Sequence, residues 1–280
     1  MRKFRALAEI LQAEGLAPQG FCEPRLADAA LLQRAHDPRY VAQVLQQEVP
    51  AALERRIGLP VTAEVARRAC AAVGGTLLAA RLALEHGAAC NTAGGSHHAF
   101  RAGGAGFCVF NDVAVAALQL LEEGRVRRIL VVDLDVHQGD GTAEILTAEP
   151  RAFAFSMHCE SNYPTKKVPG DLDIGLAAGT GDRDYLDALS SHLPKLFETV
   201  QPELVFYNAG VDVHGDDQLG KLGLSDEGLA ARDRMVFELA RFHGAAVAGV
   251  LGGGYGHDAV VLARRHAALH RTAAATFAPG

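Results

Sequence analysis

The chain lacks the features that mark secreted proteins and membrane proteins. Its five cysteines are odd in number, widely scattered and never spaced as Cys-x-x-Cys, which argues against a disulfide framework or a thiolate zinc site. No apolar run is long enough to span a bilayer, and none follows the basic residues near the N-terminus. We therefore expect a cytoplasmic protein that does not contact a membrane.

Concentrated positive charge is also missing. The formal net charge is -6 and the basic stretches are short, so we expect no direct binding of nucleic acid. The 280 residues, 49% of them hydrophobic, are enough for a large buried core. Because no internal repeat or break in composition divides the chain, we expect residues 1–280 to form a single domain.

The pattern of apolar residues changes along the chain. Up to about residue 87 it is helical, with one helix before Gly15 and a long alanine-rich helix over Val65 to Leu84 that Thr62 caps and Gly87 ends. Beyond that point, helical segments alternate with short apolar runs at 129–132, 152–155, 204–207 and 246–251. This alternation predicts an α/β fold with a mostly parallel central sheet and helices on both faces.

Polar residues gather just after the expected strands. They are His97-His98 after 88–91, Asp133 and Asp135 after 129–132, Ser156 and His158 after 152–155, Asp212 after 204–207, and the run from Gly252 to Tyr255 after 246–251. Ligands of open parallel sheets bind beyond the carboxyl ends of the strands. We therefore expect these side chains to meet at one edge of the sheet.

The run from Asp133 to His137 carries a candidate metal site. Asp133, Asp135 and His137 stand at every second position, so an extended backbone presents all three on one face. Asp135, His137 and Asp212 fit the few protein ligands of a hydrolytic zinc site, which keeps an open position for water. Oxygen and imidazole ligands also suit iron(II) or manganese, so ligand type does not decide the ion.

Two neighbouring histidines and one tyrosine are candidates for proton transfer and oxyanion binding. Asp133 and Asp140 could each orient one of His97 and His98 and raise its basicity. Tyr255 could donate a hydrogen bond to a developing oxyanion, since a phenol is neutral near pH 7. The alternative is that the histidines are satisfied core residues and Tyr255 an ordinary strand aromatic.

Five motifs follow one another along the chain: GSHHA (95–99), GFCVFND (106–112), DLDVHQGDGT (133–142), NAGVD (208–212) and GGGY (252–255). In these motifs the chain resembles the histone deacetylase family, which includes acetylpolyamine amidohydrolases and acetoin-utilisation proteins. The resemblance runs from about Arg5 to His270. Further motifs, SMH (156–158), NYP (162–164) and DLDI (171–174), look most like the class IV branch and its bacterial relatives.

The resemblance implies an arginase-like α/β fold and hydrolysis of an acyl-lysine amide. It implies that Asp135, His137 and Asp212 hold zinc. It also implies that His98, paired with Asp140, acts as general base and then as general acid, and that His97, paired with Asp133, acts electrostatically. Tyr255 would polarise the carbonyl of the substrate. By the same resemblance, Gly106, Phe107, Gly253 and Gly254 line the substrate tunnel. A structural potassium ion is expected at Asp133, Ser156 and the backbone carbonyls of Asp135, His137 and Met157.

The chain departs from the family at its beginning. Family members usually begin with a short strand and a loop before the first helix, whereas Met1 falls about where that helix starts. We therefore expect the sheet to lack one edge strand and the mouth of the active site to lack one wall. Either the start is assigned too late or the pocket is shorter and more open.

The function that these residues favour is zinc-dependent deacylation of acylated lysine in a peptide or protein. One alternative is a small-molecule amidohydrolase acting on acetylpolyamines, although the chain shows no insertion that would narrow the entrance. A ureohydrolase would need the ligands of two metals, and a non-catalytic acyl-ligand sensor would typically have lost one of these groups. The sequence indicates neither the preferred acyl group nor the oligomeric state.

Overall fold

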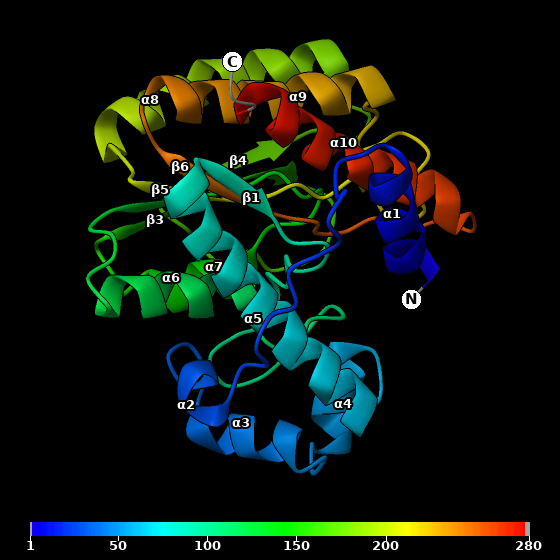
Figure 1. Ribbon diagram of the computed structural model, residues 1–280. Helices are drawn as coiled ribbons and strands as arrows, with labels where there is room; N and C mark the ends of the chain where they lie inside the picture. The colour runs from blue at the N-terminus through cyan, green and yellow to red at the C-terminus, as the bar shows by residue number, and fades with distance from the viewer. Residues whose placement is uncertain (1, 278–280) are drawn as a thin grey trace.

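A six-stranded, all-parallel sheet forms the centre of the molecule, with the strand order β1-β6-β5-β2-β3-β4. It is seen in a computed structural model that describes residues 2–277 (Figure 1). The strands are β1 (Ala88–Cys90), β2 (Ile129–Asp133), β3 (Ala152–Cys159), β4 (Leu172–Leu176), β5 (Leu204–Asn208) and β6 (Ala246–Val250). The predicted α/β fold with a parallel sheet is confirmed.

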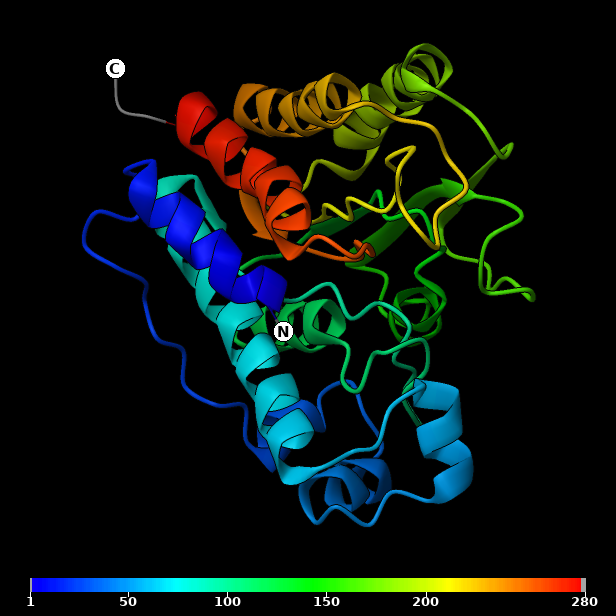
Figure 2. The ribbon, with the colours of Figure 1, turned by 90° about the vertical axis from the view of Figure 1, so that its right-hand side faces the viewer.

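Helices cover both faces of this sheet. Within residues 2–277 they are α1 (Arg2–Ala13), α2 (Ala29–Leu32), α3 (Pro38–Leu45), α4 (Ala51–Ile57), α5 (Ala63–His86), α6 (Asp112–Glu122), α7 (Asp140–Leu146), α8 (Asp182–Val200), α9 (Asp226–Phe242) and α10 (Ala259–Phe277). Figure 1 shows α8, α9 and α10 above the sheet, α5, α6 and α7 below it, and α2 to α4 around the far end of α5. α1 packs against α10 and lies in front of α5 in the view of Figure 2.

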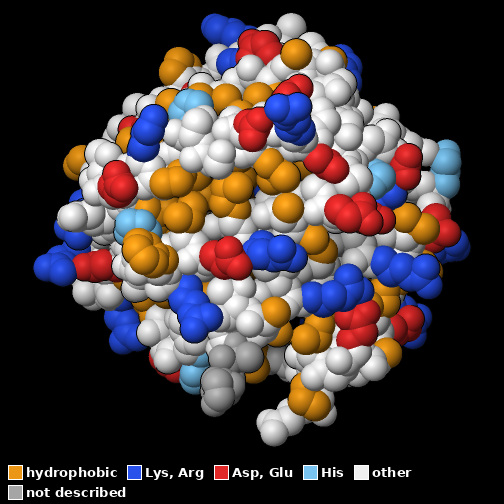
Figure 3. Space-filling model, turned by 90° about the horizontal axis from the view of Figure 1, so that it is seen from above, with side chains coloured by type: hydrophobic (Ala, Val, Ile, Leu, Met, Phe, Trp, Pro, Cys, Tyr) orange, Lys and Arg blue, Asp and Glu red, His pale blue; other side chains and the backbone are white. Residues whose placement is uncertain are grey.

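The strands are buried on both faces, and this produces two separate cores. In β2, Ile129 and Val131 belong to the core between the sheet and helices α5 and α6. Leu130 and Val132 belong to the core between the sheet and helices α8, α9 and α10. Successive side chains of a strand point to opposite faces, so a continuous apolar run suits a strand that is covered twice. The outer surface of the upper helices carries intermixed acidic and basic side chains (Figure 3), as a solvated helix layer does.

The predicted helices agree with the structure. The helix before Gly15 is α1, and the long alanine-rich helix is α5, whose N-cap Thr62 accepts a hydrogen bond from Val65 N at 3.3 Å and whose C-cap is Gly87. Among the described residues, no helix is both long enough and apolar enough to cross a membrane.

Two details of the predicted strands are wrong. β3 does not end at residue 155 but continues to Cys159, because residues 155–159 pair with β4. Ser156 and His158 therefore lie within β3 instead of following it. β4 itself was not expected, since this edge strand is only half-buried and its short run includes Asp173 and Gly175. The expected lack of one edge strand of the family stays a prediction.

Candidate active site

The carboxyl ends of the central strands bring the candidate residues together. Asp133, the last residue of β2, is in register with Asn208 of β5 on one side and with Ser156 of β3 on the other. The segments that follow β2, β5 and β6 carry the remaining candidates, and the segment after β1 carries the two histidines. As expected for a parallel sheet, they meet at one edge.

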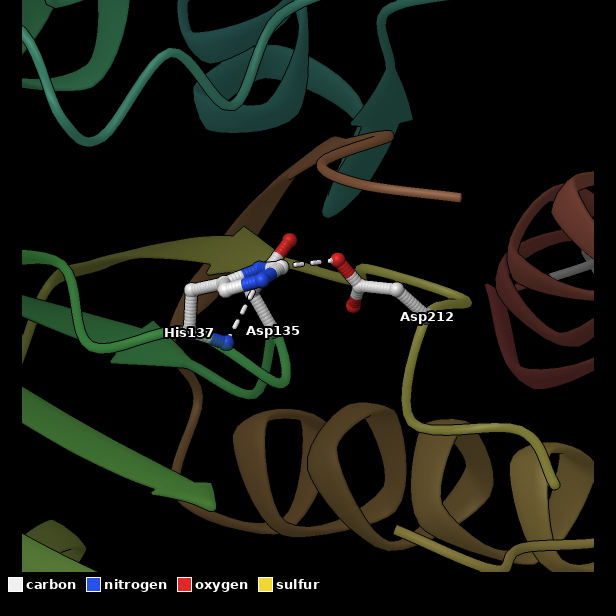
Figure 4. A group of neighbouring side chains, drawn as sticks. All are labelled: Asp135, His137 and Asp212. Atoms are coloured by element: carbon white, nitrogen blue, oxygen red, sulfur yellow. Dashed lines mark hydrogen bonds and ion pairs between the residues drawn. The ribbon is translucent and has the colours of Figure 1, made fainter. Parts of the chain in front are cut away.

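Asp135, His137 and Asp212 form a buried cluster in which each residue offers one ligand atom and these three atoms lie within 4.8 Å of one another (Figure 4). His137 Nδ1 is 3.0 Å from Asp135 Oδ1 and 3.2 Å from Asp212 Oδ2. Burial by itself would lower the pKa of His137, but the two carboxylates outweigh it and raise this pKa to about 10. The cluster therefore favours positive charge at its centre.

The cluster fits a divalent cation. Within residues 2–277, Asp212 Oδ2 is buried with His137 Nδ1 3.2 Å away but without a well-formed hydrogen bond, which is costly for a carboxylate unless a cation satisfies it. The other Asp212 oxygen accepts from Val136 N at 3.0 Å, and Asp135 Oδ2 accepts from Gly253 N at 2.7 Å. These contacts leave one oxygen of Asp212 and the imidazole of His137 directed at the same small space.

A glycine is required beside this cluster. A Cβ atom added at Gly253 would lie 1.9 Å from Asp212 Oδ2 and 2.9 Å from Asp135 Oδ2, closer than any real side chain approaches. Gly253 therefore lets the backbone after β6 come near enough to donate its N–H to Asp135. This explains physically why part of the glycine run before Tyr255 is needed.

His97 and His98 each pair with a different carboxylate. His97 Nδ1 is 2.7 Å from Asp133 Oδ2, and His98 Nδ1 is 2.6 Å from Asp140 Oδ1. All four residues are buried, and the two imidazole centroids are 4.1 Å apart. Pairing of Nδ1 with a carboxylate assigns the Nδ1 proton and leaves Nε2 of each neutral ring as an acceptor.

The two histidines differ in proton affinity. Burial and then the charge of His97 lower the pKa of His98 to about 4, although the hydrogen bond and charge of Asp140 act in the opposite direction. Burial acts in the same direction on His97, but Asp133 and Asp135 overcome it and raise the pKa of His97 to about 9. A cation on Asp135 would weaken that carboxylate's share of the effect.

Aromatic side chains surround the entrance. Phe107 and Tyr163 are 53% and 43% exposed, and the Tyr163 ring stands edge-on to His98 with its centroid 4.8 Å away. The Phe107 ring lies 6.1 Å from that of Tyr255, which in turn lies 6.3 Å from His137. A cavity of about 1190 Å³ borders His98, Phe107 and Tyr255 and continues between α1, α5 and α10.

The structure places the remaining predicted residues as follows. Gly106 borders the cavity, and a Cβ there would lie 2.6 Å from His98 Cδ2. The carbonyl of Gly254 accepts a hydrogen bond from Lys3 Nζ at 3.1 Å. Ser156 lies beside Asp133, with its hydroxyl 2.9 Å from His158 Nδ1, so the expected potassium ligands are neighbours. The potassium ion itself stays a prediction.

Several residues that support the site were not singled out from the sequence. Asn208 Nδ2 donates to Asp133 Oδ1 at 3.0 Å, and the Asp112 carboxylate accepts from Gly95 N and Ser96 N just before the histidines. Arg232 of α9 is fully buried and donates to the carbonyl oxygens of Leu134 at 3.2 Å and Gly210 at 2.6 Å, one residue before Asp135 and two before Asp212. Asn208, Asp112 and Tyr163 lie inside motifs quoted above, which was the available signal for them.

Comparisons with known proteins agree with this geometry. The model of the histone deacetylase domain matches residues 1–271. An uncharacterized protein of Picosynechococcus sp. is 50% identical over 274 residues, which cover 98% of this chain and 91% of that protein. The acetoin utilization protein AcuC of Bacillus subtilis is 30% identical, with 83% of this chain and 66% of that protein covered.

Other relatives are longer or more distant. Histone deacetylase 2 of Arabidopsis thaliana is 37% identical over 186 residues, which cover 65% of this chain but only 48% of that protein. The crystal structure of the HDA15 HD domain superimposes with a TM-score of 0.78 at 23% sequence identity, covering 99% of this chain and 80% of that one. This second likeness shows the shared fold.

The chain belongs to the histone deacetylase family. Its relatives, which include a probable deacetylase of Archaeoglobus fulgidus, support a hydrolase of the deacetylase type. The family is generally metal-dependent, and the buried group of Asp135, His137 and Asp212 agrees with that property.

Proposed function

We propose that this protein is a zinc-dependent lysine deacylase that hydrolyses acyl-lysine amides in peptides or proteins. One observation carries the proposal: two buried histidine–aspartate pairs lie directly beside a three-residue cluster suited to a divalent cation. Single-metal hydrolysis needs this combination of an open metal position and a separate proton carrier. The proposed hydrolysis needs no serine or cysteine as a covalent nucleophile.

Asp135, His137 and Asp212 are the proposed ligands. Zinc bound there would lower the pKa of the attacking water and polarise the amide carbonyl. Iron(II) would suit the same oxygen and nitrogen ligands. Asp212 Oδ2, which lacks a well-formed hydrogen bond within residues 2–277, and a cluster made of two carboxylates and one imidazole support both ions.

His98 is the proposed general base and acid. Its lowered pKa keeps it neutral near pH 7, and Asp140 holds Nδ1, so Nε2 can accept a proton from the attacking water. The same nitrogen then gives that proton to the departing lysine amine. His97, whose pKa the Asp133 and Asp135 carboxylates raise, is the proposed electrostatic group: in its protonated form it would stabilise the negative charge that develops on the substrate.

Tyr255 is the proposed donor to the carbonyl oxygen of the substrate. Burial, and then the charges of Asp212 and Asp135, raise the pKa of its phenol, so it keeps its proton and can donate it as a hydrogen bond. Phe107 and Tyr163 offer partly exposed apolar surfaces on two sides of the entrance. Such surfaces suit the aliphatic stem of a lysine side chain.

A direct comparison of substrates tests the proposal. Zinc-loaded protein should hydrolyse an acetyl-lysine peptide faster than acetylspermidine, and a chelator should abolish the turnover while zinc restores it. Hydrolysis of acetylspermidine alone would support a small-molecule amidohydrolase. Zinc-loaded protein that is inactive on a panel of acyl-lysine peptides and on acetylspermidine would support an acyl-ligand sensor.

Three further assignments accompany this proposal. The NYP motif with Tyr163 beside His98 supports placement in the class IV branch. The register of Asp133 with Ser156 supports a structural potassium ion, which a dependence of the melting temperature on potassium over sodium would test. The composition supports a cytoplasmic location.

A further inference from the structure

We propose that Asp217 is a positioning residue that holds Tyr255 in place for the reaction. The inference rests on the proposed function of Tyr255. The need for such a residue arises from the sequence, since Tyr255 follows three glycines that have no side chains to pack. Its backbone must therefore be held by other parts of the chain.

The segment after β5 holds that backbone at two points. Asp217 Oδ2 accepts a hydrogen bond from Tyr255 N at 2.7 Å, and Gln218 N donates to Tyr255 O at 3.2 Å. These contacts fix both polar groups of the Tyr255 backbone. The direction in which the phenol leaves the backbone is thereby restricted.

The Asp217 carboxylate is itself held firmly. Its other oxygen, Oδ1, accepts from Leu219 N at 2.8 Å and from Gly220 N at 2.9 Å. One carboxylate therefore takes three backbone N–H groups, two from its own turn and one from the segment after β6. Hydrogen bonds to an ionised acceptor are stronger than those between neutral groups, so this contact is well suited to fix a loop.

The turn also adjoins the metal-ligand candidate Asp212. A Cβ added at Gly220 would lie 1.8 Å from the carbonyl oxygen of Asp212, so the turn folds directly back against that residue. Asn162 Nδ2 closes the turn from the outside by donating to Leu219 O at 2.7 Å. One short segment thus carries a metal-ligand candidate at its start and the support for Tyr255 five residues later.

Asp217→Asn is the most informative variant. The remaining Asn oxygen can still accept from Leu219 N and Gly220 N and keep the turn, while an NH₂ group replaces the oxygen that faces Tyr255 N. We expect kcat for an acetyl-lysine peptide to fall by about 10- to 100-fold, as for a catalytic group displaced by part of an ångström. KM and zinc content should stay close to those of the unmodified protein.

A double-mutant cycle separates positioning from a general structural role. In a Tyr255→Phe background, Asp217→Asn should change kcat by less than about twofold, because the group that it positions is already gone. Asp216→Ala is the matched control, since the Asp216 side chain is exposed and pairs with Arg265 at 2.8 Å. The control should leave kcat unchanged. An undiminished loss in the Tyr255→Phe background, or no loss in the unmodified one, would overturn the proposal.

A readout that needs no activity distinguishes this inference from the proposed function. In protein labelled with fluorotyrosine, the Tyr255 signal, assigned by its loss in Tyr255→Phe, should shift or broaden in Asp217→Asn and not in Asp216→Ala. This result would support the positioning role even if no acyl-lysine substrate were hydrolysed. If the Asn variant does not fold, slow exchange of the Tyr255 amide hydrogen in the unmodified protein supports the contact, and fast exchange refutes it.

Discussion

Replacing Gly253 by alanine tests whether the glycine run before Tyr255 exists to make room for the metal ligands. The added Cβ would lie 1.9 Å from Asp212 Oδ2. Ordinary contact is at about 3.5 Å, so the carboxylate or the backbone must move by about 1.5 Å. Metal–ligand distances tolerate only about 0.2 Å, so a shift of this size would remove Asp212 from coordination.

The expected result is a large loss of zinc affinity with little loss of folding. Removing a group that merely supports a ligand costs about 10- to 100-fold in affinity, and loss of the ligand itself should exceed that range. Zinc affinity would be measured by competition with a chromophoric chelator. Thermal melting of the zinc-free protein would show whether the fold is retained.

Gly256→Ala is the matched control in the same segment. A Cβ there would lie 3.7 Å from Leu262, which is ordinary van der Waals contact, and the backbone at neither glycine has a positive φ. The two variants therefore differ in the clash with the ligands and not in backbone strain. Wild-type zinc affinity in Gly253→Ala, or an equal loss in Gly256→Ala, would refute the argument.

Four other outcomes are expected. His98→Ala should retain zinc while turnover falls by about 10²- to 10⁴-fold, and loss of zinc would instead make His98 a ligand. Tyr255→Phe should lower kcat by about 10²- to 10³-fold, and unchanged turnover would remove the phenol from the mechanism. Burial lowers the pKa of His36 from 6.5 to about 4. Between pH 6.5 and pH 4 the unfolded chain therefore binds more protons than the folded one. As the pH falls through this range, the free energy of unfolding should drop by about 3 kcal/mol. Urea titrations of His36→Gln should lack this pH dependence, and parallel profiles would contradict it. The cavity of about 1190 Å³ continues well beyond the catalytic residues. Acyl-lysine peptides with acyl groups of increasing length should therefore keep a measurable kcat/KM up to hexanoyl. A sharp loss of kcat/KM already at propionyl would show that the cavity does not take the acyl chain.

Burial explains which strands could be predicted from the sequence. β2, β5 and β6 are covered on both faces, so their sequences are continuous apolar runs that stand out from the helical segments. β4 lies at the edge of the sheet and is half-buried, and its polar residues hide it among the loop residues around it. The sheet edge is therefore where the pattern of apolar residues carried too little information.

The same contrast holds for the site. Residues that follow strand ends could be proposed because the parallel topology alone brings them to one edge. Arg232 and Asp217 could not, since their roles depend on how α9 and the segment after β5 pack against backbone carbonyls and amides far away in the sequence. Such contacts leave no periodicity or spacing in the chain.

Besides burial and the charge of His97, the carboxylates around each ring contribute to the difference between the pKa values of His97 and His98. Asp133 faces His97 Nδ1, and Asp135 Oδ1 is 3.7 Å from His97 Nε2, so two carboxylates stabilise the protonated imidazole from its two nitrogens. Asp140 stands alone beside His98, and its Oδ1 also accepts from the backbone N–H of Gly141 at 3.0 Å, which draws on the same charge. Environments that separate the pKa values of two neighbouring groups assign the roles of acid and base. We therefore expect substitutions of the two carboxylates to change the proton affinities of the histidines. Asp140→Asn should slow proton transfer while zinc stays bound. Asp133→Asn should lower the pKa of His97 in an NMR titration.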